Sequence, residues 1–394
     1  MENGKLLVRL DRALYGCVQS AKLWYDKLLG TLEQLGFTRN EVEPCVMTKT
    51  INGKRCILTI YVDDILVLSE DRNTHQWVAE KLREVFDDVK VESSEDLSYL
   101  GMHVRLRKGE CIIAMKNFTE ALVTEYTKSH PDLTTRATPA TSDLFNVKAG
   151  EELDKAGQKY FHSTVAKLLY LAKRTRPDIL TAVSFLTTRQ KHPTKEDQKK
   201  LDRVMGYLAG TCDKPLVLSC NSDPRIIAYI DASFGCHLDG MSHTGATLFV
   251  GQGCVQATSR KQEMVTKDST EAELVALSDM IPSIELCDEF IRSLGYKNVR
   301  PPLILQDNKS TISMVTQGGG KTRNKHLRAR QYLVKARVDA KEAEIAYQQT
   351  EKMIADGLTK AIQGDRFKWI IDRIMGTPSD PALVDRGALS EQEN

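Results

Sequence analysis

The chain has 394 residues, of which 41% are hydrophobic and 27% charged, and its formal net charge is +2. This composition is that of a globular protein and excludes a wholly disordered or fibrous chain, while the length suits two or three domains. The small net charge does not indicate a nucleic-acid binder, so any such function has to rest on local clusters of basic residues.

The cysteines and the apolar segments indicate where the protein works. The nine cysteines form no CxxC pair, and no apolar stretch is long enough to cross a bilayer. Met1 is followed by charged residues rather than by a secretory leader. We therefore expect an intracellular protein with reduced thiols and no membrane partner.

The first part of the chain predicts a hairpin that carries two neighbouring aspartates. Asn52-Gly53, between two apolar runs, is the strongest short hairpin signal. Asp63 and Asp64 follow the second run, so we expect them at a tight strand-turn-strand at the edge of a cleft, where they could bind Mg²⁺ or Mn²⁺. The elements expected here are a strand at 5–10, a helix at 21–37, and strands at 45–51 and 54–62.

The middle of the chain is mainly helical, and from residue 225 strands and helices alternate, which indicates an α/β domain. Before residue 225 we expect a helix at 75–86, a strand pair within 99–115, a helix from 117 that ends in a loop, and helices within 158–210. After it we expect strands at 225–235, 244–251, 253–261, 302–308 and 343–350, and helices at 269–295, 309–317, 324–340 and 351–360. The polar segment 376–394 is predicted to be a disordered tail.

Four carboxylates in this last region are candidate ligands for metal ions. Asp231 and Asp307 each end an apolar strand, while Glu273 and Asp356 are expected in the first turns of two helices. Converging carboxylates repel one another unless cations bridge them, and two Mg²⁺ ions are the usual arrangement for phosphodiester hydrolysis. Each of these residues could instead have an ordinary structural role: an aspartate at a strand end can form a turn, and a glutamate near a helix start can cap the helix. Glu271 could form such a cap with Asp268.

A basic segment lies between the last two candidate carboxylates and could follow the phosphates of a duplex. A solvated helix face is an equally good interpretation of the same pattern. Its proximity in sequence to the candidate site favours contact with nucleic acid. The candidate residues are Lys321, Arg323, Lys325, His326, Arg328 and Arg330.

These motifs together resemble the ribonuclease H of copia-type LTR retrotransposons. "YIDASFG", "STEAELVAL", "LQDNKSTI", "NKHLRARQYLV" and "EKMIADGLTK" follow the blocks of that family in order. The resemblance implies that Asp231, Glu273, Asp307 and Asp356 bind the catalytic metals, with Glu271 as the alternative to Glu273. Many ribonucleases H carry a mobile histidine just before the last aspartate, and "YQQTEKMIAD" has none.

Residues 5–222 resemble the C-terminal part of copia-type reverse transcriptase. The matching blocks are "RALYGCVQSAKLWYDKL", "YVDD", "YLGMHV" and "LLYLAKRTRPDI". The resemblance implies a nucleotide pocket lined by Tyr15, Gly16 and Tyr61, a metal-binding Asp63 and a supporting Asp64. The aspartate that this family places upstream of the "LYG" block has no counterpart here, so we expect an incomplete polymerase site.

The resemblance implies α/β and α+β architecture, with a partial polymerase palm and thumb followed by a ribonuclease H-like domain. The expected parts are 1–145, a helical connection at 146–222, the ribonuclease H-like domain at 223–362, and a terminal helix with a tail at 363–394. The implied function is hydrolysis of the RNA strand of RNA–DNA hybrids within a transposition cycle, with two Mg²⁺ or Mn²⁺ ions. Implied partners are the hybrid, an RNA template, DNA, and the integrase and protease regions of a longer polyprotein, in a cytoplasmic particle or the nucleus. The alternative is a non-catalytic remnant of a retroelement that binds nucleic acid.

Overall fold

The computed structural model describes residue 14 and residues 16–86, 88–220, 223–296, 299–317 and 324–377. The chain divides into two units, which are Met1–Leu100 with Glu289–Tyr296, and Gly101–Asp288 with Lys297–Asn394. The strand expected at 5–10 and nearly all of the tail expected at 376–394 lie outside the described residues. No helix in the described ranges is both long and apolar enough to cross a membrane.

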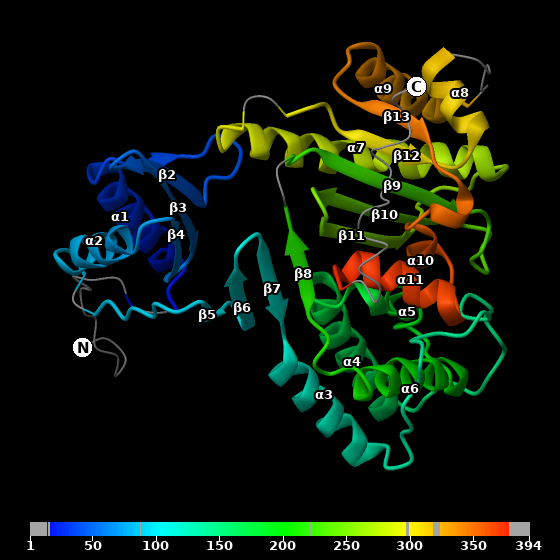
Figure 1. Ribbon diagram of the computed structural model, residues 1–394. Helices are drawn as coiled ribbons and strands as arrows, with labels where there is room; N and C mark the ends of the chain where they lie inside the picture. The colour runs from blue at the N-terminus through cyan, green and yellow to red at the C-terminus, as the bar shows by residue number, and fades with distance from the viewer. Residues whose placement is uncertain are drawn as a thin grey trace, which may run out of the picture. The chain divides into compact units, whose positions relative to one another are not determined.

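The first unit is an antiparallel sheet covered by two helices (Figure 1). Leu28 and Leu32 of α1 and Val78 of α2 pack with Met47 and Leu58 of the sheet in one apolar core. The strands lie in the order β1-β2-β3-β4. The elements are α1 (Ser20–Gln34), β1 (Thr38–Arg39), β2 (Val46–Ile51), β3 (Lys54–Tyr61), β4 (Asp64–Ser69), α2 (Arg72–Arg83) and β5 (Asp96–Tyr99).

The two turns of this sheet confirm the hairpins expected from the sequence. Asn52 and Gly53 both have positive φ, 51° and 77°, as a type I′ turn requires, and they join β2 to β3. At the other end of β3, Tyr61 pairs with Asp64, so Val62 and Asp63 form the turn into β4. Both aspartates are exposed at this turn.

The second unit contains a five-stranded mixed sheet in the order β11-β10-β9-β12-β13. Strands β9, β10 and β11 are antiparallel neighbours, while β12 runs parallel to both β9 and β13. Because β9 and β12 are parallel, their carboxyl ends lie side by side, which is where ligands collect in such sheets. The strands are β9 (Ile226–Ser233), β10 (His243–Val250), β11 (Gly253–Lys261), β12 (Leu303–Gln306) and β13 (Glu344–Tyr347).

Helices from distant parts of the sequence share one core with this sheet. Phe161 and Leu168 of α4 belong to the same cluster as Phe249 of the sheet and Ile370 of α11. Figure 1 shows α5, α10 and α11 together beside β11. These helices are α3 (Lys116–Ser129), α4 (Lys155–Arg174), α5 (Leu180–Thr187), α6 (Lys195–Ala209), α10 (Asp356–Thr359) and α11 (Gly364–Met375).

The remaining elements confirm the expected mixture of α/β and α+β structure. Before residue 225 they are β6 (Met102–Arg107), β7 (Glu110–Ala114), η1 (Pro177–Ile179) and β8 (Leu216–Ser219). After it, the predicted alternation is completed by α7 (Ser269–Ser293), α8 (Lys309–Gln317), α9 (Lys325–Asp339) and η2 (Thr350–Lys352). Two details of the prediction are wrong. The helix expected at 351–360 is split into η2 and α10, and Glu273 lies in the second turn of α7 rather than the first.

Candidate functional site

Three of the predicted carboxylates meet at the carboxyl ends of β9 and β12. Asp231 lies on β9, Asp307 directly follows β12, and Glu273 comes from α7. One oxygen atom from each carboxylate lies within 4.8 Å of the other two. This arrangement presents hard oxygen ligands from three separate elements to a common point, which suits Mg²⁺ or Mn²⁺.

Two of the three carboxylates are buried, and burial raises the pKa of both, while Asp307 is partly exposed. Asp231 and Glu273 are only 2% and 4% exposed. Burial, with repulsion from Asp356 and Asp307, raises the pKa of Asp231 to about 6, against the opposing effects of Lys360 and Thr359. Burial, with repulsion from Asp231 and Asp307, also raises the pKa of Glu273 well above its usual range. Carboxylates whose charged form is this unfavourable would gain from a bound cation.

The structure separates the roles of Glu273 and Glu271. Glu273 is held inside the site by the side chain of Gln306, at 3.2 Å, and by the backbone N–H of Ala232. Glu271 instead accepts a 2.9 Å hydrogen bond from the backbone N–H of Lys267, and its own N–H donates to Asp268. Glu271 therefore stabilises the start of α7, which is the capping role that the sequence left open for it.

Asp356 stands at the first position of α10 and is held by two cations. Its Oδ1 lies 2.6 Å from Lys360 Nζ, and its Oδ2 lies 2.5 Å from a nitrogen of Arg366. Lys360 Nζ also lies 3.5 Å from Asp231 Oδ2. Burial alone would lower the pKa of Lys360, but the two carboxylates outweigh it and raise that pKa to about 12. Lys360 therefore connects Asp356 to the three clustered carboxylates.

A glycine lets α10 approach the sheet closely enough to bring Asp356 there. A Cβ on Gly245 of β10 would lie 2.6 Å from Cγ2 of Thr359 and 2.9 Å from the carbonyl oxygen of Ala355. Gly245 also pairs with Asp231 across β9 and β10. The hydroxyl of Thr359 donates a hydrogen bond to Asp231. A side chain at residue 245 would push α10, and Asp356 with it, away from the site.

A buried chain of hydrogen bonds fixes the other side of α10. His237 Nε2 lies 3.0 Å from His243 Nδ1, and His243 Nε2 lies 2.7 Å from Ser259 Oγ. Ser259 donates at 2.7 Å to the backbone carbonyl of Leu358 in α10. Because Ser259 uses its proton there, it accepts from His243 Nε2–H, so His243 Nδ1 accepts from His237. Burial lowers the pKa of both histidines, to about 4 for His237 and about 3 for His243, so they stay neutral.

Sequence reasoning missed the groups that position Asp307 and Asp356. Thr350 donates a 3.0 Å hydrogen bond to Asp307 Oδ2. Arg366 donates to the carbonyls of Thr350 and Glu351 as well as to Asp356, so α11 holds the η2 segment against the site. Lys360 could have been found, because it follows Asp356 at helical spacing of four residues. No local signal connects Arg366 to the site, since that contact depends on the packing of α11.

Asp63 and Asp64 lie at the β3–β4 turn of the first unit, and Tyr61 precedes them with its side chain exposed. In the ranges that the structure describes, no third carboxylate gathers with this pair. Val62 adopts φ +56°, which is rare for a β-branched residue, and its carbonyl accepts a 2.8 Å hydrogen bond from Trp24 Nε1. Gly16 is exposed, and Tyr15 lies outside the described residues. The nucleotide pocket remains a prediction.

The basic segment is partly described, since Lys321 and Arg323 lie outside the described residues. Lys325 and His326 are exposed at the start of α9, where Asn324 caps the helix by accepting from the N–H of His326 at 3.0 Å. Arg328 is exposed on the same helix. Arg330 pairs with Asp279 of α7, so its charge is used within the fold. Contact of this segment with nucleic acid remains a prediction.

Comparison with known proteins identifies relatives along nearly the whole chain. Residues 1–141 match the family model described as reverse transcriptase (RNA-dependent DNA polymerase). The retrovirus-related Pol polyprotein from transposon RE1 of Arabidopsis thaliana is 28% identical over 378 residues, covering 95% of this chain. This chain spans 25% of the length of that polyprotein. The relationship by sequence therefore reaches through both units.

Solved structures also align with the chain. The foamy viral protease-reverse transcriptase in complex with RNA/DNA hybrid is 12% identical, with a TM-score of 0.48, covering 86% of this chain and 39% of that one. RNase H1 from the archaeon Halobacterium salinarum is 17% identical, with a TM-score of 0.26, covering 34% of this chain and 93% of that one.

Proposed function

We propose that this chain, which is similar along nearly its whole length to retrotransposon Pol polyproteins, hydrolyses the RNA strand of RNA–DNA hybrids with its second unit. The observation that carries this proposal is the cluster of Asp231, Glu273 and Asp307, whose oxygens lie within 4.8 Å of one another. Asp356 is the fourth carboxylate of the proposed site. Lys360 links it to the cluster, because the nitrogen Nζ of Lys360 lies 2.6 Å from Asp356 and 3.5 Å from Asp231.

The donor set fits divalent metal ions. Clustered carboxylates are the ligands that Mg²⁺ or Mn²⁺ takes in phosphodiester hydrolysis, and burial raises the pKa of two of them, Asp231 and Glu273. Two such ions would be held by Asp231, Glu273, Asp307 and Asp356. When bound, the metals supply Lewis-acid charge at the scissile phosphate and an activated water. The positions of the four carboxylates would determine where the metal ions bind.

Each residue around the cluster has a positioning role in this proposal. Gln306 and Ala232 hold Glu273 toward the cluster, and Thr359 orients Asp231. Arg366 fixes Asp356 at the start of α10. Lys360 keeps a positive charge among the carboxylates, which lowers their mutual repulsion at the place where an anionic phosphate would arrive.

Asp63 and Asp64 are proposed to be the remaining part of a polymerase site in the first unit. We expect no primer extension by this chain alone, because no third carboxylate in the described residues joins them. Nucleotide incorporation that depends on Asp63, measured with the purified chain and either Mg²⁺ or Mn²⁺, would contradict this expectation.

The test of the main proposal is cleavage of an end-labelled RNA–DNA hybrid by the purified 394-residue chain. Asp307→Asn keeps the shape of the side chain but removes its charge, so we expect cleavage to fall on the order of 10²-fold or more. Chelation of divalent metal should abolish cleavage. Asp63→Asn is the matched control, because it removes the same charge from the other unit and should leave cleavage unchanged. If Asp307→Asn cuts as fast as the parent, the assignment of this site is wrong. If the parent binds hybrids without cutting them, the protein is a nucleic-acid-binding remnant instead.

A further inference from the structure

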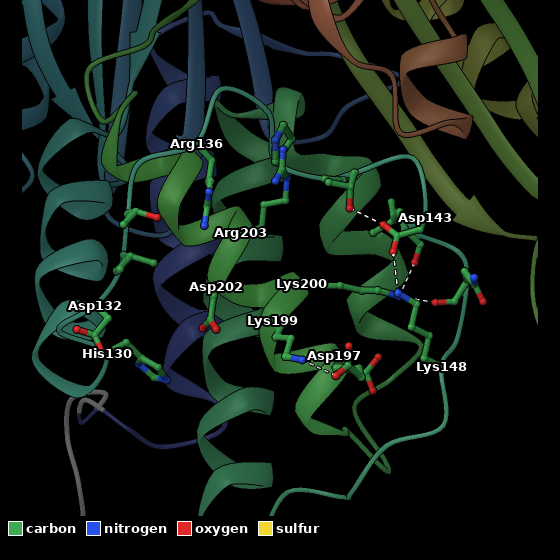
Figure 2. Close-up of a pocket in the computed structure, with 18 of the residues that line it drawn as sticks. His130, Asp132, Arg136, Asp143, Lys148, Asp197, Lys199, Lys200, Asp202 and Arg203 are labelled. Atoms are coloured by element: carbon green, nitrogen blue, oxygen red, sulfur yellow. Dashed lines mark hydrogen bonds and ion pairs between the residues drawn. The ribbon is translucent and has the colours of Figure 1, made fainter.

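A pocket in the second unit lies apart from the carboxylate cluster, between α6 and the segment 129–148 (Figure 2). Its volume is about 720 Å³, within the range of pockets that bind ligands. Charged side chains line it from both sides. Whether it binds anything depends on which of these charges already have partners.

Most of the carboxylates on its wall are occupied by neighbours. Asp202 accepts hydrogen bonds from Tyr126 and Gln198, and Asp132 is exposed at the rim. The other carboxylates pair with cations at 3.3 Å or less, namely Asp143 with Lys148, Glu196 with Lys199, and Asp197 with Arg189. The nitrogen of Lys200 donates to the backbone carbonyls of Leu144 and Asn146.

Arg136 and Arg203 differ from the paired charges of the pocket because, in the part of the chain that the structure describes, no carboxylate pairs with them. Figure 2 shows their side chains next to each other in the pocket, and among the described residues neither has a carboxylate at ion-pair distance. Arg203 donates one hydrogen bond, at 2.8 Å, to Thr138, while its buried Nε has no acceptor. Burial and then the charge of Arg136 lower the pKa of Arg203. Two adjacent guanidinium groups and a buried donor without an acceptor would both be satisfied by a bound anion.

The backbone holds the two arginines together. A Cβ on Gly206 in the interior of α6 would lie 2.3 Å from the carbonyl oxygen of Thr134, so only glycine permits this approach of the loop. The N–H of Arg136 donates at 3.1 Å to the carbonyl of Gly206. The backbone of Arg136 is thus held one helical turn from Arg203 by main-chain contacts, and its side chain is exposed to solvent, where a phosphate could reach it.

The lining favours a phosphate group over a whole nucleotide. Two guanidinium forks suit the oxygens of a phosphate. A nucleobase would also need an aromatic face, and the lining offers only the ring of His130, which is already stacked on Tyr126 with centroids 4.2 Å apart. A phosphodiester of a nucleic-acid strand therefore fits these residues better than a free nucleotide.

Hydrogen bonds connect this pocket to the carboxylate cluster. Thr138, which accepts from Arg203, donates at 2.9 Å to Gln363, and Gln363 donates at 2.7 Å to the carbonyl of Ala140. Gln363 is the residue before α11, whose Arg366 holds Asp356. The loop that carries the pocket and the carboxylate of Asp356 are thus both held by residues at the start of α11.

We propose that Arg136 and Arg203 bind a backbone phosphate of the RNA–DNA hybrid, outside the stretch that is cut. This inference rests on the proposed substrate, but it concerns binding rather than cleavage. The two proposals can therefore fail separately.

The test is binding of a fluorescent hybrid to the full chain in EDTA, where cleavage cannot occur, measured by anisotropy at several salt concentrations. The double variant Arg136→Ala/Arg203→Ala should bind about 10-fold more weakly, and the slope of log K against log salt should shrink by about 1–2. Lys108→Ala/Lys155→Ala removes the same charge from exposed positions of this unit and should bind like the parent. Arg136→Lys/Arg203→Lys keeps the charge but loses the guanidinium forks, so it should keep the salt slope of the parent and bind with an affinity between those of the parent and the alanine variant.

Two results would overturn the proposal. One is hybrid affinity and salt slope equal to the parent in the folded alanine double variant. The other is a rise in Tm with inorganic phosphate or ATP that the double variant loses while hybrid binding stays intact, which would identify a small phosphate ligand instead. If the parent binds hybrids through the arginine pair yet never cuts them, the proposed function fails and this site stands.

Discussion

Lys360 places its ammonium group 2.6 Å from Asp356 and, at 3.5 Å, also reaches Asp231. This single cation lies within a set of carboxylates that would otherwise face one another unshielded. Its position explains how the fold tolerates so many buried acids before any metal binds, since a buried charge without a partner is strongly destabilising.

Replacing Lys360 by Met should therefore destabilise the protein mainly when metal is absent. We expect a loss of about 1–3 kcal/mol in EDTA, below the full value for a buried pair because Lys360 is partly exposed. Saturating Mg²⁺ should recover much of it, because metal ions then neutralise the same carboxylates. Urea unfolding in EDTA and in Mg²⁺ measures both values. Lys352→Met, which removes an exposed lysine nearby, is the control, and an equal loss in both buffers would contradict the prediction.

Glu273 and Glu271 should differ sharply when each is changed to Gln. Glu273→Gln removes a carboxylate from the cluster, so cleavage of a hybrid should fall on the order of 10²-fold or more. Glu271→Gln affects only the capping contact with Lys267 and should cost about 0.5–1 kcal/mol of stability with cleavage near that of the parent. Cleavage rates and unfolding curves are measured for both variants. A larger loss of cleavage in Glu271→Gln than in Glu273→Gln would exclude Glu273 as the metal ligand.

Gly245→Ala should impair cleavage although residue 245 carries no chemistry. The new methyl group would overlap Thr359 and the backbone of α10, so α10 must shift and carry Asp356 away from the cluster. Overpacking of this kind costs about 1–3 kcal/mol. Gly30→Ala is a suitable control, because nothing lies within 4 Å of a Cβ in that helical position, and it should stabilise the protein slightly. Unchanged cleavage by Gly245→Ala would mean that the position of α10 is unimportant.

The neutral histidine pair should make the protein less stable in mild acid. Burial lowers the pKa of His243 to about 3 and that of His237 to about 4, whereas an unfolded histidine titrates near 6.5. Below pH 6.5 the unfolded chain therefore binds protons that the folded chain does not, and stability falls as the pH falls, by up to about 1.4 kcal/mol per pH unit for each histidine.

His243→Gln tests this dependence, because glutamine can still donate to Ser259 but does not titrate. Free energies of unfolding at pH 7.5 and pH 5.5 should differ less for the variant than for the parent. Asp231, whose pKa is raised to about 6, acts in the opposite direction in both proteins, so the difference between them reports the histidine. Identical pH dependence in parent and variant would show that His243 does not remain neutral.

Truncated proteins can test the predicted domain boundary at residue 223. Helix α5 lies in the same core as β11 and α10, because Leu180 and Val183 are buried with Leu358. We therefore expect a fragment that begins at residue 101 to unfold cooperatively, and one that begins at 223 to be markedly less stable. Thermal unfolding of the two fragments measures the difference. Equal stability would support a separable domain at 223–362.

The site residues on strands could be predicted because their signals are local. Asp231 and Asp307 stand where apolar runs end, and parallel strands bring such ends together. The sequence does not distinguish Glu273 from Glu271 in the same way, since both lie near the start of one helix and differ in which way the side chain points. The prediction of one continuous helix at 351–360 is wrong because a tertiary contact ends the first turn. Arg366 binds the carbonyls of Thr350 and Glu351, and the chain turns there before α10 begins.

The arginine pair could not be predicted from the sequence at all. Arg136 and Arg203 lie on different elements, and their proximity depends on a loop that packs against the backbone of Gly206. A glycine inside a predicted helix is a signal of close approach, but it does not say which segment approaches. Contacts of this kind appear only when the fold is known.

The core shared by α4 and α11 also has a consequence for biosynthesis. Phe161 and Leu168 are synthesised before Ile370, Ile374 and Met375, which belong to the same core. During translation the apolar faces of the earlier helices therefore remain uncovered until α11 emerges. The second unit is consequently expected to depend on chaperones while it is being synthesised, and to complete its folding only after translation of α11.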